Sequence, residues 1–286
     1  MVARVACDTG VRALAIKGPI LGLQGLRGSK MSRDVDFLVH PRDMRSLVGA
    51  LRRVGWFVDD GFRAPSVTRS HSIVMRHAEW PCEIDLHHRF PGFLASPDFV
   101  FEFLWECRTS AELAGASMAC CDVMTHGSLA ALHYIRDRAT GSRSSEFDEL
   151  LAGMDRQLTS ADKVELGARV ARLGATETLR SVLELLDVPV EAAAEFDTDA
   201  EMLEWRLAVN ATTLTSLGWV VALRGSGLRR WPSILWQAAW LNEADLRRAE
   251  PSLGLGRAPL LVARMRRLGR GLRALPRAIW AIARLN

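Results

Sequence analysis

Long apolar runs are missing from this 286-residue sequence. The longest one, around Leu214 to Leu223, is interrupted by polar residues and is much shorter than the roughly 20 residues that a membrane-spanning helix needs. The N-terminus also lacks the basic and then apolar layout of a secretory signal peptide. We therefore expect no transmembrane helix.

Paired cysteines are missing as well. The five cysteines form an odd set without a CxxC pair, at Cys7, Cys82, Cys107, Cys120 and Cys121. Disulfide frameworks use regularly spaced pairs, so this set predicts a reduced, cytoplasmic protein. A zinc site is disfavoured too, because the histidines around Cys82 match no compact ligand spacing.

Lysine is scarce in this chain. Of its 37 basic residues, only Lys17, Lys30 and Lys163 are lysine. A bias of this kind is explained by genomic base composition, so the arginine excess and the net charge of +4 are weak evidence for nucleic-acid binding. The bias does single out Lys17, which a chain that almost always uses arginine has kept directly before Gly18.

Apolar and charged content are those of a folded globular protein. Hydrophobic residues make up 49% of the chain and charged residues 24%, values that exclude intrinsic disorder as a whole-chain description. A length of 286 residues exceeds that of most single domains. We therefore expect more than one compact unit.

Mixed strand and helix signals fill residues 1–106. Apolar or alternating runs predict strands at 13–16, 34–39, 56–58, 72–77 and 82–88, with the last two joined as an antiparallel hairpin. Helices are predicted over 20–26 and from Pro41, where apolar residues recur at helical spacing up to Val54. Little chain precedes Ala13, so an N-terminal helix is expected to be short or missing, unless the true start codon lies upstream.

Helical signals dominate from about Asp122 onward. They predict helices over 123–138, 146–157, 161–173, 177–186 and 200–214. The region 226–286 is rich in tryptophan and arginine, and its last part has the pattern of a basic amphipathic tail. We predict three domains, 1–110, 111–225 and 226–286, and a solvated arginine face or an anionic partner, RNA or a membrane surface, for the third.

The sequence Arg33-Asp34-Val35-Asp36-Phe37 carries the clearest chemical signal. Residues two apart on a strand project to the same face, so Asp34 and Asp36 lie together while Val35 and Phe37 point into a core. Two like charges this close repel unless a cation neutralises them. Carboxylate oxygens are ligands for hard divalent ions, so the pattern predicts a Mg²⁺ site.

These residues carry a resemblance. A Lys17-Gly18 turn and a helix, then Asp34-x-Asp36 on a strand, a further helix and a strand reading Glu83-Ile-Asp85-Leu-His87 together resemble the uncharacterised nucleotidyltransferase family of the DNA polymerase β superfamily. The resemblance covers roughly residues 10–160. It implies an α+β chain in which a minimal nucleotidyltransferase fold, a mixed sheet with helices, occupies residues 1–110 and is followed by a helical domain.

The resemblance also implies a two-metal site. Such a fold brings three carboxylates onto two Mg²⁺ ions, which clamp both ends of an in-line displacement at the α-phosphate of a nucleoside triphosphate. Asp34 and Asp36 correspond to two of the metal ligands, with Asp36 bridging both ions. Asp85 corresponds to the third, which helps deprotonate the attacking hydroxyl. Glu83 lies on the same face by alternation and stays an alternative to Asp85.

The turn before the first carboxylate corresponds to the triphosphate site. Gly18 is expected where backbone N–H groups approach the phosphates, and Lys17 offers them a point charge. This chain has no hydroxyl in a turn where the broader superfamily more often has Gly-Ser or Gly-Gly. Ser29, Ser32 and Arg33 are expected to contact nucleotide, and Arg33 is equally suited to pairing with Asp34 or Asp36.

Three functions remain open from the sequence. The first is a Mg²⁺-dependent, ATP- or other NTP-using enzyme that transfers a nucleoside monophosphate to a hydroxyl of a small molecule, a peptide or protein, or an RNA end. The second is a toxin-type nucleotidyltransferase of a toxin–antitoxin or phage-defence system. The third is a non-catalytic nucleotide or RNA binder, against which the intact Asp34, Asp36 and Asp85 argue.

Overall fold

The computed structural model describes the greater part of the chain. The described residues are 1–30, 32, 34–59, 71–113, 115–138, 144–190, 199–210, 223, 226–240, 243, 246–247, 253–254 and 256–285. They divide into two compact units. The first comprises Met1–Asp59 and Ser70–Trp205, and the second is formed mainly by Arg206–Asn286. This division does not test the three domain ranges proposed from the sequence, which stay a prediction.

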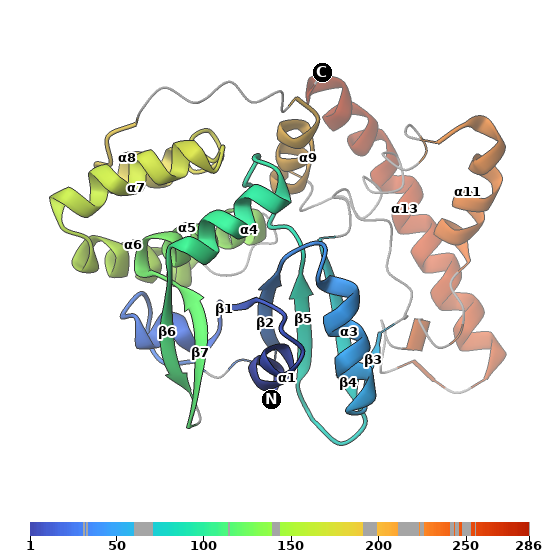
Figure 1. Cartoon of the computed structure of the whole chain (residues 1–286). Helices are drawn as coiled ribbons and strands as arrows, with labels where there is room; N and C mark the ends of the chain where they lie inside the picture. Colours follow the sequence, from blue (N-terminus) through green and yellow to red (C-terminus); the bar gives the residue numbers. More distant parts are fainter. Residues whose placement is uncertain are drawn as a thin grey trace. The chain divides into compact units, whose positions relative to one another are not determined.

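A seven-stranded mixed sheet is the centre of the first unit (Figure 1). Its order is β3-β4-β5-β2-β1-β7-β6. Strand β2 pairs antiparallel with β1 and parallel with β5, and β1 pairs parallel with β7. The strands are β1 (Ala13–Ile16), β2 (Asp34–Val39), β3 (Trp56–Val58), β4 (Ser72–His77), β5 (Glu83–His87), β6 (Arg108–Leu113) and β7 (Ala116–Cys121).

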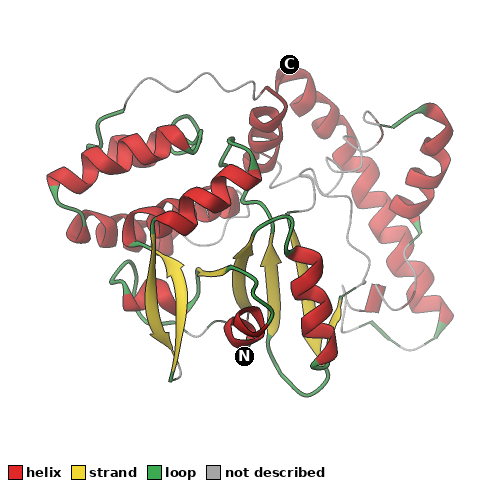
Figure 2. Ribbon diagram, in the orientation of Figure 1, coloured by secondary structure: helices red, strands yellow, loops and turns green. Residues whose placement is uncertain are grey.

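Helices accompany this sheet and continue after it, which Figure 2 shows in red. Those of the first unit are α1 (Val2–Asp8), α2 (Pro19–Leu23), α3 (Met44–Arg53), α4 (Pro97–Glu106), α5 (Val123–Arg138), α6 (Ser144–Gln157), α7 (Ser160–Arg172) and α8 (Arg180–Leu185), with α9 (Asp199–Asn210) at its end. Strands β1 and β2 and helix α5 have the predicted bounds. The predicted α+β class, with helices following the sheet, is confirmed.

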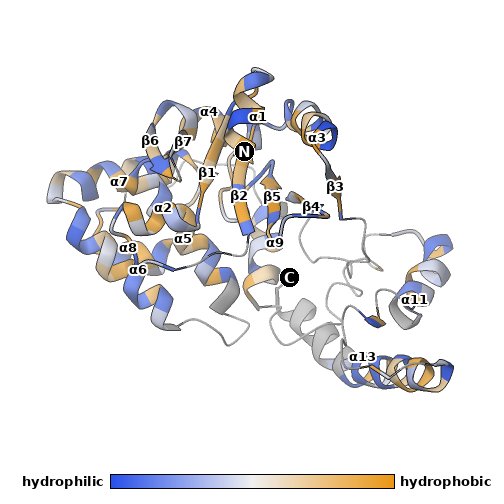
Figure 3. Ribbon diagram, turned by 90° about the horizontal axis from the view of Figure 1, so that it is seen from below, coloured by the Kyte–Doolittle hydropathy of each residue, from blue (hydrophilic) through white to orange (hydrophobic). Residues whose placement is uncertain are grey.

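One face of the sheet packs its apolar side chains against α1 and α3. Phe37 and Leu86 are partners on neighbouring strands and are buried in one cluster with Leu47 and Leu51 of α3 and Ala6 of α1. Strand β1 and most of strand β2 accordingly appear orange in Figure 3. Because successive side chains alternate between faces, the residues at Asp34, Asp36 and Asp85 belong to the other face.

Three elements of the first unit were not predicted, and helices α3 and α8 begin later than expected. Strands β6 and β7 extend the sheet beyond residue 106, and the side chains of β6 are mostly exposed, so this edge strand lacks an apolar signal. Helix α4 is almost continuously apolar, without a clear period, and begins where Ser96 caps it and Pro97 occupies its first turn. Helix α3 begins at Met44, because Pro41 opens a turn before it.

A close backbone contact joins the helical segment to the loop after α2. Gly153 of α6 is buried, and a Cβ atom added there would collide with the carbonyl group of Leu26 and lie 2.8 Å from its Cα. Nearby, the Gly28 N–H donates to Glu149 Oε1 over 2.8 Å. Helix α6 therefore packs against the segment that leads from the Lys17–Gly18 turn to β2.

The second unit contains η2 (Leu228–Arg230), α11 (Trp231–Ala239) and the long α13 (Arg257–Leu285). Leu260 and Ala263 of α13 are buried together with Leu246. The Arg264 guanidinium lies over the Trp240 ring, 4.5 Å from its centroid. Among the described residues, no helix has the length and apolar content to cross a membrane.

Replacing Gly153 with alanine is predicted to destabilise the first unit. Alanine normally stabilises a helix interior by about 0.5–1 kcal/mol relative to glycine. At Gly153 the added methyl group meets the Leu26 backbone, so we expect a net loss of roughly 1–3 kcal/mol in the free energy of unfolding. Gly49→Ala in α3 is the matched control, because nothing lies within 4 Å of its Cβ position. Equal effects of the two substitutions on urea unfolding would contradict this packing.

Candidate functional site

Strand register places two carboxylates side by side. In the parallel pair of β2 and β5, Asp36 is the partner of Asp85 and Asp34 is the partner of Glu83. Partners in a ladder point to the same face of the sheet. The two aspartates therefore face each other on the side opposite the α1 and α3 core.

A histidine completes this group. His87 Nε2 lies 2.9 Å from Asp36 Oδ1 and 3.2 Å from Asp85 Oδ2. One potential ligand atom from each of the three residues falls within 4.8 Å of the others. The side chains of His87 and Asp36 are 1% and 4% exposed, so these two members of the group are almost inaccessible to solvent.

Lys17 supplies a positive charge to the same carboxylate. Its Nζ donates to Asp36 Oδ1 over 2.8 Å, and it lies over the Phe90 ring at 5.6 Å from the centroid. Lys17 follows β1 directly, next to β2, which is why its side chain reaches Asp36. The predicted contact of Lys17 with the phosphates stays a prediction, and the contact that the structure shows is with Asp36.

Both aspartates are stabilised in their ionised form. Burial by itself would raise the pKa of Asp36, but the His87 hydrogen bond and the Lys17 charge together hold that pKa below its usual value. Burial acts in the same direction on Asp85, where hydrogen bonds from His87 and Ser72 and the charges of His87 and Lys17 outweigh it and lower the pKa strongly. Both groups are therefore carboxylates at neutral pH.

The three side chains fit a divalent cation. Carboxylate oxygens and an imidazole nitrogen are common ligands of such ions in proteins. Asp85 Oδ1 is buried and has no hydrogen-bond partner, which leaves one acidic oxygen with its acceptor capacity unused. Asp36, Asp85 and His87 are thus the residues that could hold a metal.

Of the other residues singled out in the sequence, Asp34 and Ser32 contact each other beside the Lys17–Gly18 turn. Asp34 is exposed and outside the group of three, and it accepts a hydrogen bond from Ser32 Oγ over 2.7 Å. Ser32 also lies beside Gly18, whose Cβ position would be 3.9 Å from Ser32 Cβ. Ser29 is exposed. Arg33 lies outside the described residues.

Glu83, the alternative third acid, has a different environment. Its Oε1 pairs with Arg76 Nη2 at 2.5 Å, and its side chain is 43% exposed. Glu83 is not one of the three residues with clustered ligand atoms, while Asp85 is. The geometry favours Asp85 over Glu83 as the partner of Asp36.

A series of hydrogen bonds connects α5 to the Lys17–Gly18 turn, and these bonds were not predicted from the sequence. His126 Nε2 accepts from the Lys17 N–H over 2.7 Å, and His126 Nδ1 lies 2.7 Å from Gln24 Oε1. Arg27 donates to the Gly18 carbonyl over 2.9 Å. Nothing in the local sequence marks Gln24 or Arg27 for these contacts.

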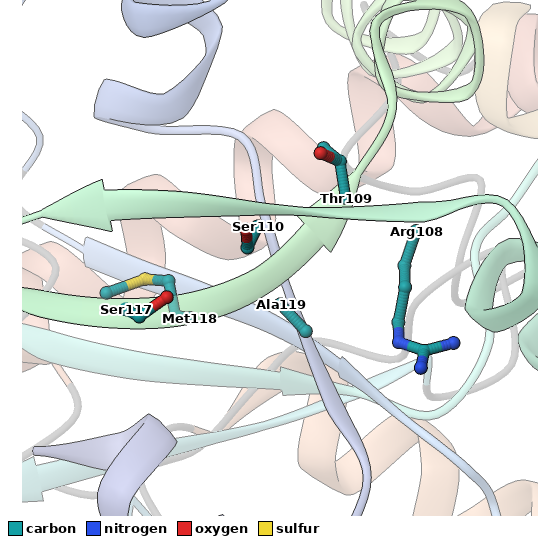
Figure 4. A pocket seen from close by; sticks show the side chains of 6 residues that line it. All are labelled: Arg108, Thr109, Ser110, Ser117, Met118 and Ala119. Atoms are coloured by element: carbon teal, nitrogen blue, oxygen red, sulfur yellow. The ribbon is translucent and has the colours of Figure 1, made fainter.

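Several hollows lie in the part of the sheet near β7. A cavity of about 820 Å³, mostly apolar, is lined by α1 and β7 and reaches the Lys17–Gly18 turn and the start of β2. A second hollow of about 510 Å³ lies on the β6–β7 hairpin, where Arg108 and Thr109 project to opposite sides of β6 (Figure 4). Arg108 packs over Trp105, and the described residues that line this hollow include no carboxylate, histidine or cysteine.

The family model of the uncharacterised nucleotidyltransferases matches residues 2–189, a range that contains the whole sheet and the helices through α8. The chain belongs to this family. The matched region includes Lys17, Asp36, Asp85, His87 and His126. The resemblance noted from the sequence is therefore confirmed, while the roles of these residues stay proposals.

Three solved structures are similar in fold to this family member. The antibiotic-resistance factor ANT(2'')-Ia is 11% identical, with a TM-score of 0.41 over 64% of this chain and 91% of that one. The lincosamide adenylyltransferase LnuA is 12% identical, with a TM-score of 0.33 over 54% and 92%. A nucleotidyltransferase-like protein from Paracoccidioides brasiliensis is 14% identical, with a TM-score of 0.39 over 68% and 93%. No curated protein matches the chain.

His126 is predicted to make the protein less stable in mild acid. Burial first, and then the Arg27 charge, lower the pKa of His126 from 6.5 to about 3. In mild acid the unfolded chain therefore binds a proton at His126 that the folded protein does not bind. The stability that is present above pH 6.5 is lost as the pH falls. For this residue alone the loss between pH 7 and pH 5 is about 2 kcal/mol.

The substitution His126→Gln removes this titration and keeps an oxygen acceptor near the position of Nε2. We expect the free energy of unfolding of the variant to fall less steeply between pH 7 and pH 5 than that of the unsubstituted protein, as measured by urea titration at each pH. Identical slopes would show that His126 is not held neutral by the fold.

Proposed function

We propose that this protein is a Mg²⁺-dependent nucleotidyltransferase that moves a nucleoside monophosphate from ATP or another NTP to a hydroxyl of an acceptor. The observation that carries the proposal is the facing pair of ionised carboxylates, Asp36 and Asp85, joined by His87 within 4.8 Å. Membership of a nucleotidyltransferase family supports it independently. The small molecule, peptide or RNA end that accepts the nucleotide is left open.

In this proposal each acidic residue has a separate role. Asp36 and Asp85 would hold the metal ions, and Asp34 would complete the set from its exposed position at the start of β2. Bound divalent ions would supply positive charge at the α-phosphate and at the attacking oxygen. The acceptor oxygen forms a bond to the α-phosphorus, the bond to the leaving oxygen breaks, pyrophosphate departs and Asp85 receives the hydroxyl proton.

The triphosphate is proposed to lie at the Lys17–Gly18 turn, where Gly18 and Ser32 are neighbours. Ser29 and Arg33 belong to the same proposed nucleotide contacts. Lys17 Nζ is within 2.8 Å of Asp36, so it lies next to the metal and phosphate positions rather than in open solvent. From this position the Lys17 ammonium group can bind the phosphates while the backbone of the turn keeps its conformation.

Two further parts of the proposal concern the rest of the chain. A cytoplasmic location is supported by five free thiols, of which Cys120 and Cys121 are buried. An anionic partner for the C-terminal region is supported by α13, where Arg266, Arg270 and Arg273 are exposed. Exposed apolar side chains such as Met265 lie on the same helix, which is the composition of a helix that binds an anionic surface.

Asp36→Asn and Asp85→Asn are predicted to abolish metal-dependent binding of nucleotide. Each substitution removes one negative charge from the proposed ligand group and keeps the side-chain shape. We expect Mg·ATP binding, measured by calorimetry, to weaken by about 100-fold or more, and labelled nucleotide transfer to fall at least as much. Glu83→Gln is the matched control, since Glu83 pairs with Arg76, and it should leave both nearly unchanged.

Other outcomes would favour the other functions. Nucleotide binding that is the same with and without Mg²⁺, and in Asp36→Asn, would indicate a non-catalytic binder. Growth arrest on expression that is lost in Asp36→Asn and relieved by a neighbouring gene would assign the transferase activity to a toxin. Strong loss in Glu83→Gln with full activity in Asp85→Asn would exchange the roles of these two acids.

A further inference from the structure

The turn after β1 has an unusual backbone. Lys17 and Gly18 have φ angles of 61° and 57°, so two consecutive residues adopt the left-handed region. Glycine accepts this at no steric cost, but a residue with a Cβ atom loses about 1–2 kcal/mol. Among described non-glycine residues, only Asp187 shares a positive φ with Lys17. The conformation at Lys17 must therefore be stabilised by contacts from elsewhere.

His126 makes the decisive contact, and its protonation pattern follows from its neighbours. The Cys121 carbonyl can only accept, so Gln24 Nε2 donates to it over 2.7 Å. This orients Gln24 Oε1 toward His126 Nδ1, and an amide oxygen can only accept, so the ring proton is on Nδ1. His126 Nε2 is then free to accept from the Lys17 N–H.

The Gly18 carbonyl is held from the same side. Arg27 Nη2 donates to this oxygen over 2.9 Å, and Arg27 Nη1 lies 3.3 Å from the Tyr134 hydroxyl of α5. Crowding does not impose the turn, since the nearest neighbour of a Gly18 Cβ would be 3.9 Å away. Hydrogen bonds to His126 and Arg27 are thus what fixes the left-handed pair.

We propose that His126 is a positioning residue for nucleotide binding: its Nδ1–H tautomer holds the Lys17 backbone left-handed and thereby directs the Lys17 side chain to the Asp36 and triphosphate position. The effect on nucleotide binding rests on the proposed function, whereas the contact between His126 and the Lys17 backbone does not. Without the His126 acceptor, the partly buried Lys17 N–H loses its partner and the strained φ at Lys17 loses its compensation. The turn then relaxes, and Lys17 leaves Asp36.

The tautomer can be observed in the unsubstituted protein. We expect the ¹⁵N and ¹H spectrum of His126 at pH 7 to show a protonated Nδ1 and a bare Nε2, the less common form of a free imidazole. The signals of His126 are assigned by their absence from the spectrum of the His126→Gln variant. A protonated Nε2 would overturn the proposal at once, because that atom could not accept from Lys17.

Two substitutions at His126 test the consequence for binding. His126→Leu removes the acceptor, whereas His126→Gln returns an oxygen to the same reach. We expect Mg·ATP affinity to fall about tenfold or more in His126→Leu and to stay within about threefold in His126→Gln. His133→Gln, on the same helix but away from the turn, is the control and should bind as the unsubstituted protein does.

Affinity for Mn²⁺ alone separates positioning from general damage. Asp36, Asp85 and His87 are on β2 and β5, so His126→Leu should bind Mn²⁺ at least as tightly as the unsubstituted protein. Weaker Mn²⁺ and weaker Mg·ATP binding together would mean a purely structural role, and unchanged Mg·ATP binding would remove His126 from nucleotide binding. If the unsubstituted protein binds no Mg·ATP, the proposed function fails, while the tautomer result still decides the geometry.

Discussion

Repulsion between the carboxylates of Asp36, which is buried, and Asp85, which is partly buried, is the constraint around which the first unit is organised. Parallel pairing of β2 and β5 brings Asp36 opposite Asp85. Lys17 and His87 compensate this repulsion, each through Asp36 Oδ1. That arrangement requires β1 next to β2 and His87 two residues beyond Asp85. Charge compensation and sheet order therefore depend on each other.

Local sequence was enough to predict elements in which polar and apolar residues alternate or recur regularly. Strand β2 is an example, since Asp34 and Asp36 alternate with Val35 and Phe37, and the same pattern located the face that carries Asp36. The expectation that Val35 points into the core was wrong, because its side chain is 40% exposed near the start of the strand. The spacing of Glu83, Asp85 and His87 likewise placed three polar groups on one face of β5. Choosing Asp85 over Glu83 needed the register with β2 and the position of Arg76, which are tertiary facts.

Features stabilised by distant residues could not be predicted in this way. The β6–β7 hairpin pairs with β1 through Cys120 and has an exposed outer strand, so its own sequence has little apolar periodicity. The role of His126 depends on Gln24 and Lys17, more than 100 residues earlier. A positive φ at Lys17 contradicts local preference, and local rules fail where tertiary contacts fix the backbone.

The parallel pairing of β1 with β7 has a consequence for biosynthesis. On a growing chain β1 is made early, whereas the partner of Ala15, Cys120, and the acceptor for the Lys17 N–H, His126, are made more than 100 residues later. Contacts so far apart in sequence close late, because the intervening loop loses entropy first. A partly synthesised chain therefore contains Asp36 and Asp85 before it contains the residue that accepts from Lys17, and we expect the Lys17–Gly18 turn to be fixed only after α5 has left the ribosome.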